Sequence, residues 1–155
     1  MRRLILFLIT HGLALAIGFA LGIYLLPILT APEGPDAAML EEKAQSALFS
    51  AEFTRDLRGS DVIHWGEGTI SVSAGEVTHQ GRLAPGPDYK LYLTQGLVDH
   101  EDAFDRSKAV QIGDVKSFSG FIVEIPEGVD VNAYDSVLVW CEAFSEFITA
   151  ATYRN

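Results

Sequence analysis

Residues 134–152, YDSVLVWCEAFSEFITAAT, contain two short runs of β-branched and aromatic residues, SVLVWC and FITAAT. Such side chains favour extended backbone, and alternate residues of a strand face opposite sides of a sheet. On this parity Cys141 shares a face with Val137 and Val139, whereas Trp140 faces the other way. The stretch therefore predicts two strands and separates the chain's single cysteine from the neighbouring tryptophan.

Similar runs lie upstream and are separated by turns such as Pro-Gly-Pro at 85–87 and Pro-Glu-Gly at 126–128. Glycine and proline favour turns, so they mark the ends of strands. The expected strands span 69–73, 76–83, 89–94, 121–125, 136–141 and 147–152, with weaker candidates at 62–65 and 110–112. Short strands with regular turns and no helical period predict a mainly β fold, an antiparallel β-sandwich or flattened barrel.

The amino terminus has the pattern of a membrane anchor. Arg2 and Arg3 precede residues 4–29, which contain no charged residue. As a helix this run is about 39 Å long at ~1.5 Å per residue, enough to cross a hydrocarbon core of about 30 Å. A cleaved signal peptide is the alternative, but its apolar region spans only about 7–15 residues before a small-residue cleavage site. We therefore expect an uncleaved signal anchor, a transmembrane helix, at residues 1–30.

The two arginines also predict the orientation of the anchor. Positive charges that flank a membrane helix stay in the cytoplasm. Arg2 and Arg3 therefore predict a single-pass protein with a cytoplasmic N terminus and an exported C-terminal domain. In a Gram-negative bacterium this topology means the inner membrane, with the domain in the periplasm. The lipid bilayer is thus the first expected partner.

Small residues recur on one face of the expected helix. His11, Ala14, Gly18 and Gly22 follow one another at intervals of three or four residues. Small side chains let two helix backbones approach closely in lipid, and a histidine in a membrane needs a polar partner. This face predicts contact with a membrane-protein partner or a homodimer. The alternative is that small residues are simply common in membrane helices and that His11 lies near the interface.

The segment after the anchor changes character. Residues 31–58 are expected to form a polar spacer and a juxtamembrane helix, with Asp36 capping a helix over 37–57 whose apolar stripe includes Leu40. We expect residues 59–155 to form the β domain.

Charge and cysteine content exclude several classes of protein. The formal net charge is −10, and two of the cations are Arg2 and Arg3, so the exported part is more acidic still. An acidic domain repels phosphate backbones, which excludes nucleic acid as a partner. A single cysteine excludes an intrachain disulfide, a CxxC redox pair, a CxxCH haem attachment and a multi-cysteine zinc site.

Several segments together carry a family resemblance. They are HWGEGT at 64–69, GPDYKLYL at 86–93, FSGFIVEIP at 118–126 and YDSVLVWC at 134–141, followed by Phe144, Phe147 and the pair Ala150-Ala151. On these motifs the chain from Asp61 onward resembles a DM13 domain, a module described as electron-transfer or redox-associated in secreted and membrane proteins. The resemblance implies a β-sandwich and a redox role centred on Cys141, which would act as a bare thiol or help to hold a prosthetic group such as haem.

The residues around Cys141 do not favour a thiolate. Glu142 follows directly and Glu146 lies five residues on, and both carboxylates and apolar surroundings disfavour ionisation of a thiol. Three interpretations stay open: a buried structural cysteine, a redox thiol or ligand, and a cysteine that pairs with another molecule. Trp140 and His64, the latter in the family-like HWGEGT segment, are candidate modulators of such a site.

No cofactor is identified by a motif. A blue-copper site needs a histidine and usually a methionine soon after the cysteine, and no histidine follows Cys141. Haem could use His64, His79 or His100, although His79 lies in a strand pattern that predicts an outward polar side chain. Acidic stretches at 99–105 and 130–135 could hold Ca²⁺ but lack EF-hand spacing. The metal therefore stays undetermined.

The sequence contains no motif of an independent enzyme: GxSxG, HExxH, a phosphate loop and GxGxxG are all lacking. The leading expectation is a membrane-tethered, extracytoplasmic redox or electron-transfer accessory module without catalysis of its own. The alternative is a non-catalytic protein–protein interaction or assembly subunit of a membrane complex.

Overall fold

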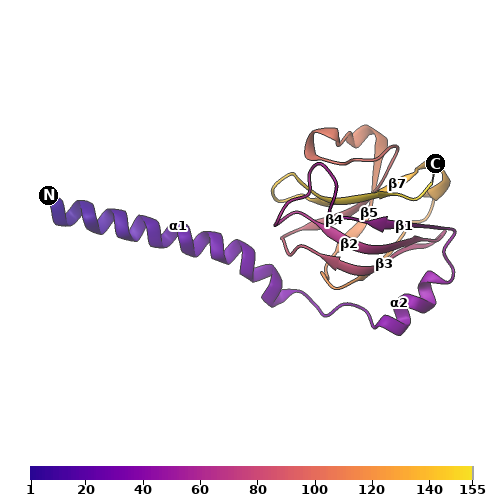
Figure 1. Cartoon of the computed structure of the whole chain (residues 1–155), viewed down its shortest axis with the longest axis horizontal. Coiled ribbons are helices and arrows are strands. Elements are labelled where there is room, and N and C mark those ends of the chain that lie inside the picture. Colours follow the sequence, from indigo (N-terminus) through magenta and orange to yellow (C-terminus); the bar gives the residue numbers. More distant parts are fainter. Residues whose placement is uncertain (155) are drawn as a thin grey trace.

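The computed structural model describes residues 1–154 and consists of a long N-terminal helix joined to a β-sandwich (Figure 1). The helix, α1 (Arg2–Thr30), extends away from the sandwich, and none of its residues is buried. It is long and apolar enough to cross a membrane, a property that N-terminal signal sequences share. The apolar helix expected from the sequence is therefore confirmed.

The sandwich has two four-stranded antiparallel sheets. The first has the order β1 (Phe49–Phe53), β2 (Gly66–Val72), β3 (Glu76–Leu83) and β6 (Phe121–Glu124). The second has the order β5 (Ala109–Val115), β4 (Tyr89–Thr94), β7 (Ser136–Cys141) and β8 (Glu146–Thr152). The expected antiparallel β-sandwich is confirmed, and β3, β4 and β7 have the predicted bounds.

The main core lies between the two sheets. Val137, Val139 and Cys141 of β7 face it, together with Leu91 and Leu93 of the neighbouring β4. The opposite face of β7 is also covered, because the segment between β4 and β5 folds over it. That segment contains two 3₁₀ turns, η1 (Glu101–Ala103) and η2 (Arg106–Lys108), and a third turn, η3 (Val131–Ala133), precedes β7. Trp140 and Leu138 therefore pack in a second, outer cluster.

The juxtamembrane helix is shorter than the sequence predicts. α2 spans only Ala37–Ala44, and residues 49–53 of the expected 37–57 helix form β1 instead. Asp36 caps α2 as expected, since its Oδ1 accepts a hydrogen bond from the backbone N–H of Ala38 at 3.0 Å. The segment from 49 to 53 is a strand because it alternates in the β period and pairs with β2 along its whole length. Pairing between distant strands thus outweighs the local helical stripe.

His79 corrects a second prediction. Its side chain points inward and is fully buried, with ring centroids 5.2 Å from Phe53 and 5.0 Å from Phe121. Its Nε2 donates to the backbone carbonyl of Glu67 at 3.0 Å, and burial lowers its pKa to about 4. Phe121 comes from β6, which pairs with β3, and Phe53 comes from β1, two strands away, so local sequence does not show that these rings enclose His79. Of the two weaker strand candidates, 110–112 lies within β5, whereas 62–65 forms no strand.

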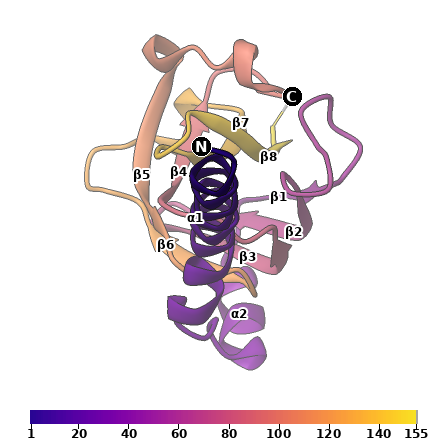
Figure 2. The same ribbon diagram turned by 90° about the vertical axis from the view of Figure 1, so that its left-hand side faces the viewer.

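The spacer and α2 attach the helix to one part of the sandwich. Gly34 lies so close to the turn between β5 and β6 that an added Cβ would be 2.7 Å from Ser119 Oγ. Leu40 of α2 is buried and lies against Gly120 of the same turn. In the view along α1, the helix stands in front of the sandwich with α2 below it (Figure 2). The last turns of α1 are thereby held beside the end of the sandwich at which β4 begins and β7 ends.

Candidate functional site

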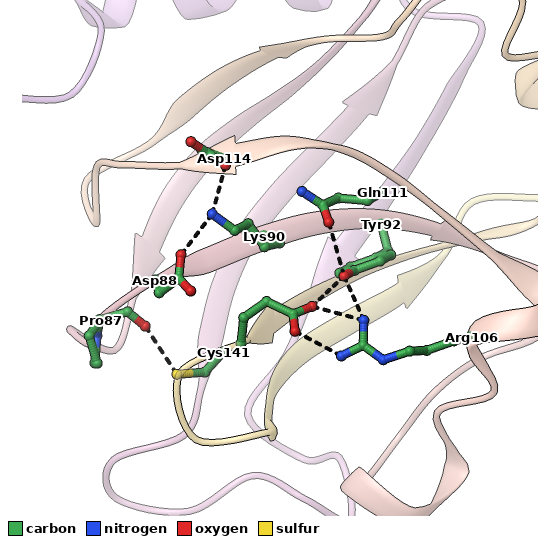
Figure 3. Close-up of polar contacts among 9 residues, drawn as sticks. Pro87, Asp88, Lys90, Tyr92, Arg106, Gln111, Asp114 and Cys141 are labelled. Atoms are coloured by element: carbon green, nitrogen blue, oxygen red, sulfur yellow. Dashed lines mark hydrogen bonds and ion pairs between the residues drawn. The ribbon is translucent and has the colours of Figure 1, made fainter.

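Cys141 is the last residue of β7 and lies at the edge of the main core. Its side chain is 3% exposed, and its Sγ donates a hydrogen bond to the backbone carbonyl of Pro87 at 3.0 Å (Figure 3). Pro87 belongs to the turn between β3 and β4, so this bond ties the end of β7 to that turn. The parity predicted from the sequence, with Cys141 beside Val137 and Val139, is confirmed.

The surroundings of Cys141 favour the neutral thiol over the thiolate. Burial raises the pKa of Cys141, and the carboxylates of Asp88 and Glu146 raise it further, although the backbone amides of Phe144 and Ala143 act in the opposite direction. A nucleophilic or redox-active cysteine needs the thiolate form and access to its partner. The burial of Cys141 and its raised pKa both act against these conditions.

His64 and Cys141, far apart in the sequence, line the same pocket of about 440 Å³. The pocket lies between the end of the sandwich and α1, and its other walls include Tyr89, Phe144 and Ile148. His64 is positioned by a local turn, because Asp61 Oδ1 accepts from the backbone N–H of His64 at 2.7 Å and Asp61 Oδ2 lies 3.1 Å from His64 Nδ1. Of the two proposed modulators, His64 thus shares a pocket with Cys141.

Trp140 lies on the other face of the sheet and does not line this pocket. Its ring centroid is 4.6 Å from that of Phe104, which belongs to the segment folded over β7. Trp140 therefore contributes to the outer cluster, on the face of β7 opposite to Cys141.

The pocket does not fit a haem. No lysine or arginine lines it to pair with the propionates, and the thiol of Cys141 is already engaged by Pro87. Among residues 1–154, no three histidine, cysteine or carboxylate side chains lie close enough together to hold a metal ion. In the acidic stretches, Asp105 and Asp130 accept hydrogen bonds from the backbone N–H groups of Ser107 and Asn132, which gives these carboxylates structural roles.

Sequence reasoning missed a polar cluster on the outer face of the second sheet (Figure 3). Arg106 binds Glu142 through both terminal nitrogens, at 3.0 and 2.8 Å, and its Nη1 also donates to the hydroxyl of Tyr92 at 2.9 Å. The Tyr92 hydroxyl in turn donates to Glu142. The hydrogen bonds from Arg106 hold the pKa of Glu142 below its usual range, although its partial burial acts in the opposite direction. The alternation of β4 places Tyr92 outward, but no local signal brings Arg106 to it.

The same view shows a second ion-pair group around Lys90. Its Nζ lies 2.7 Å from Asp88 and 2.8 Å from Asp114, which links the start of β4 to β5. Asp88 has a positive φ of 53°, in the turn conformation that its position after Gly-Pro favours.

The small-residue face of α1 is open in the single chain. A Cβ added at Gly18 or Gly22 would meet nothing within 4 Å. His11 bonds within its own helix, where its Nδ1 lies 2.9 Å from the carbonyl of Phe7 and its ring stacks on that of Phe7 at 3.8 Å. His11 therefore has a polar partner without a second helix, and the open face contains Ala14, Gly18 and Gly22.

The chain has no significant match among curated proteins or among solved structures. Residues 53–153 match the model of one protein family, described as electron transfer DM13. The matched segment starts at the end of β1 and includes all the other strands, with Cys141 and His64. Since it covers more than half of the chain, this protein belongs to the DM13 family.

Proposed function

We propose that this protein is a membrane-tethered, extracytoplasmic DM13 domain that acts as an accessory subunit in electron transfer, by assembling with a membrane partner and without a redox centre of its own. α1 is the uncleaved anchor and residues 31–58 connect it to the domain. The location is the bacterial inner membrane, with the N terminus in the cytoplasm and the domain in the periplasm.

The charges that flank α1 support this orientation. Arg2 and Arg3 lie at its start, whereas the segment after its end carries Glu33 and Asp36 and no cation before α2. The cytoplasmic flank of a membrane helix is the one enriched in lysine and arginine. A reporter enzyme that is active only outside the cytoplasm, fused after Arg154, should therefore be active.

The observation that carries the accessory role is the state of Cys141. Its thiol is buried, donates to Pro87 and has a raised pKa, so the one residue expected to carry redox chemistry is protected from it. A domain without a reactive thiol and with an open helix face is suited to binding partners.

The test is a thiol titration and an absorption spectrum of the full chain purified in detergent from membranes. A colourless protein whose Cys141 reacts only after denaturation is the expected result. A Soret band, or a thiol that reacts fast in the folded protein, would overturn the accessory role.

A second candidate function keeps Cys141 as a redox thiol or ligand, and one observation favours it. Cys141 and His64 line the same pocket, so a partner or ligand in that pocket would meet sulfur and imidazole together. Cys141→Ser separates the two functions. The substitution should abolish a redox role, but an assembly role should survive it because serine can still donate to Pro87.

A further inference from the structure

The end of the sandwich beside α1 exposes apolar side chains that the core does not use. This membrane-proximal end consists of loop 54–65, turn 84–88 and turn 142–145. Val62 is 90% exposed, and Ile63 and Phe144 are each 50% exposed. Isolated exposed apolar residues are ordinary, but a group on neighbouring loops marks a surface that contacts something apolar.

These loops lie level with the upper part of α1. Ile63 and Phe144 line the same pocket as Ala20, Ile23 and Tyr24 of the helix. Ala20 is ten residues before the end of α1, which places it about 15 Å below that end at ~1.5 Å per residue. The loops of the membrane-proximal end therefore lie beside the C-terminal part of α1 and not beyond its last residue.

The depth of that part of α1 follows from its charged start. With Arg2 and Arg3 at the cytoplasmic interface, an upright helix crosses a core of about 30 Å in roughly 20 residues. The core then ends near Ile23, and Tyr24 lies where aromatic side chains concentrate, at the boundary between acyl chains and headgroups. The loops beside these residues share that depth.

Two further features fit a lipid surface. Trp65 lines a pocket with Ile28 of α1 and Ala31, the residue after the helix, and the guanidinium of Arg55 lies 3.4 Å from the Trp65 ring centroid. Tryptophan and arginine at that height are suited to the headgroup layer. Loop 54–65 contains two arginines and two aspartates, so it is formally neutral in a chain of net charge −10.

We propose that the membrane-proximal end of the domain docks on the bilayer, with Val62, Ile63 and Phe144 inserted at the boundary between headgroups and acyl chains of the outer leaflet. The proposal rests on the membrane anchoring proposed above. Docking places the mouth of the pocket shared by Cys141 and His64 at the lipid surface, with the domain held at a fixed height and not swinging freely on its spacer.

The test measures depth with nitroxide labels on the full chain in nanodiscs of zwitterionic lipid. Cys141→Ser removes the native thiol, and Val62→Cys and Phe144→Cys each add one labelling site. Leu97→Cys is the matched control, because Leu97 is 44% exposed and follows β4 at the far end of the sandwich. Leu13→Cys, in the middle of α1, reports whether the helix spans the bilayer.

The expected result is that labels at 62 and 144 collide severalfold more with oxygen, and severalfold less with a water-soluble nickel chelate, than the label at 97. If the label at 13 lies in the hydrocarbon but those at 62 and 144 are as accessible to nickel as the one at 97, docking is wrong and the anchor stands. Protection of 62 and 144 from both reagents would also overturn docking, since it indicates a protein contact such as a second copy. If the label at 13 is itself accessible to nickel, the anchor fails.

Discussion

The Sγ of Cys141 donates a hydrogen bond to the carbonyl oxygen of Pro87 at 3.0 Å, and this bond joins the last residue of β7 to the turn that precedes β4. The two residues are 54 positions apart, so the contact exists only in the folded domain. The hydrogen bond gives Cys141 a contact that links two distant parts of the sandwich.

The free energy of unfolding of a Cys141 variant should therefore depend on whether the new side chain can still donate a hydrogen bond to Pro87. Cys141→Ser keeps a donor for Pro87, whereas Cys141→Ala loses the donor and leaves a small cavity. We expect the alanine variant to be about 1 kcal/mol less stable than the serine variant. Urea unfolding of the full chain in detergent measures the difference, and equal stability would mean that the bond contributes nothing.

The second prediction concerns pH and His79. The pKa of His79 is about 4 in the folded protein against an ordinary value of 6.5, because burial disfavours the charged ring. The unfolded chain therefore binds more protons between these values, so stability falls as the pH is lowered from about 6.5 to about 4, by roughly 3 kcal/mol for this group.

His79→Phe removes this dependence and keeps an aromatic ring between Phe53 and Phe121. Carboxylates titrate in both proteins, so the difference between their stability–pH curves isolates the histidine. We expect the variant to lose clearly less stability on acidification from pH 6.5 to 4.5. Parallel curves would show that burial does not perturb His79.

The third prediction concerns the polar cluster that holds η2 on the sheet. Arg106→Ala and Glu142→Gln each break the two-point ion pair, and the exposed position of Arg106 limits its contribution to about 1 kcal/mol. A double-mutant cycle should give a coupling energy of that size, and Arg106→Lys should recover only part of it because lysine cannot bind both oxygens at once. A coupling energy near zero would mean that solvent screens the pair fully.

The fourth prediction treats α2 as part of the folded domain. Leu40 is buried against the turn between β5 and β6, whereas its neighbour Met39 is half exposed. Leu40→Ala should cost about 2 kcal/mol, at the lower end for buried leucines because α2 lies at the edge of the fold. Met39→Ala is the matched control and should have little effect. If both variants unfold at the same denaturant concentration as the native chain, α2 is only a tether.

The fifth prediction addresses the open face of α1. Gly18→Ile and Gly22→Ile should weaken crosslinking to a second copy or to a membrane partner, since a large side chain prevents close helix approach. Gly12→Ile is the control, because Gly12 is equally free of neighbours but lies on another face. An unchanged crosslinking signal in the first two variants would exclude this face as a contact surface.

Much of the fold follows from local sequence. The span of α1 is set by an uninterrupted apolar run, and β3, β4 and β7 begin and end where the period-two pattern meets glycine, proline or a charged turn. The parity of β7 also separates Cys141 from Trp140, because a strand alternates its side chains whatever lies beside it.

Other features were decided only by contacts between distant segments. Residues 49–53 have a weak helical stripe as well as a strand pattern, and pairing with β2 selects the strand. His79 is polar, so its own strand pattern predicts an outward side chain, but Phe53 of β1 and Phe121 of β6 pack against its ring in the folded domain. Arg106 pairs with Glu142, and His64 lines the same pocket as Cys141. In both cases the two segments that come together share no sequence pattern. Local periodicity reports which way a side chain points along its own strand, whereas burial and pairing depend on which other strand lies opposite, and only the tertiary structure determines that.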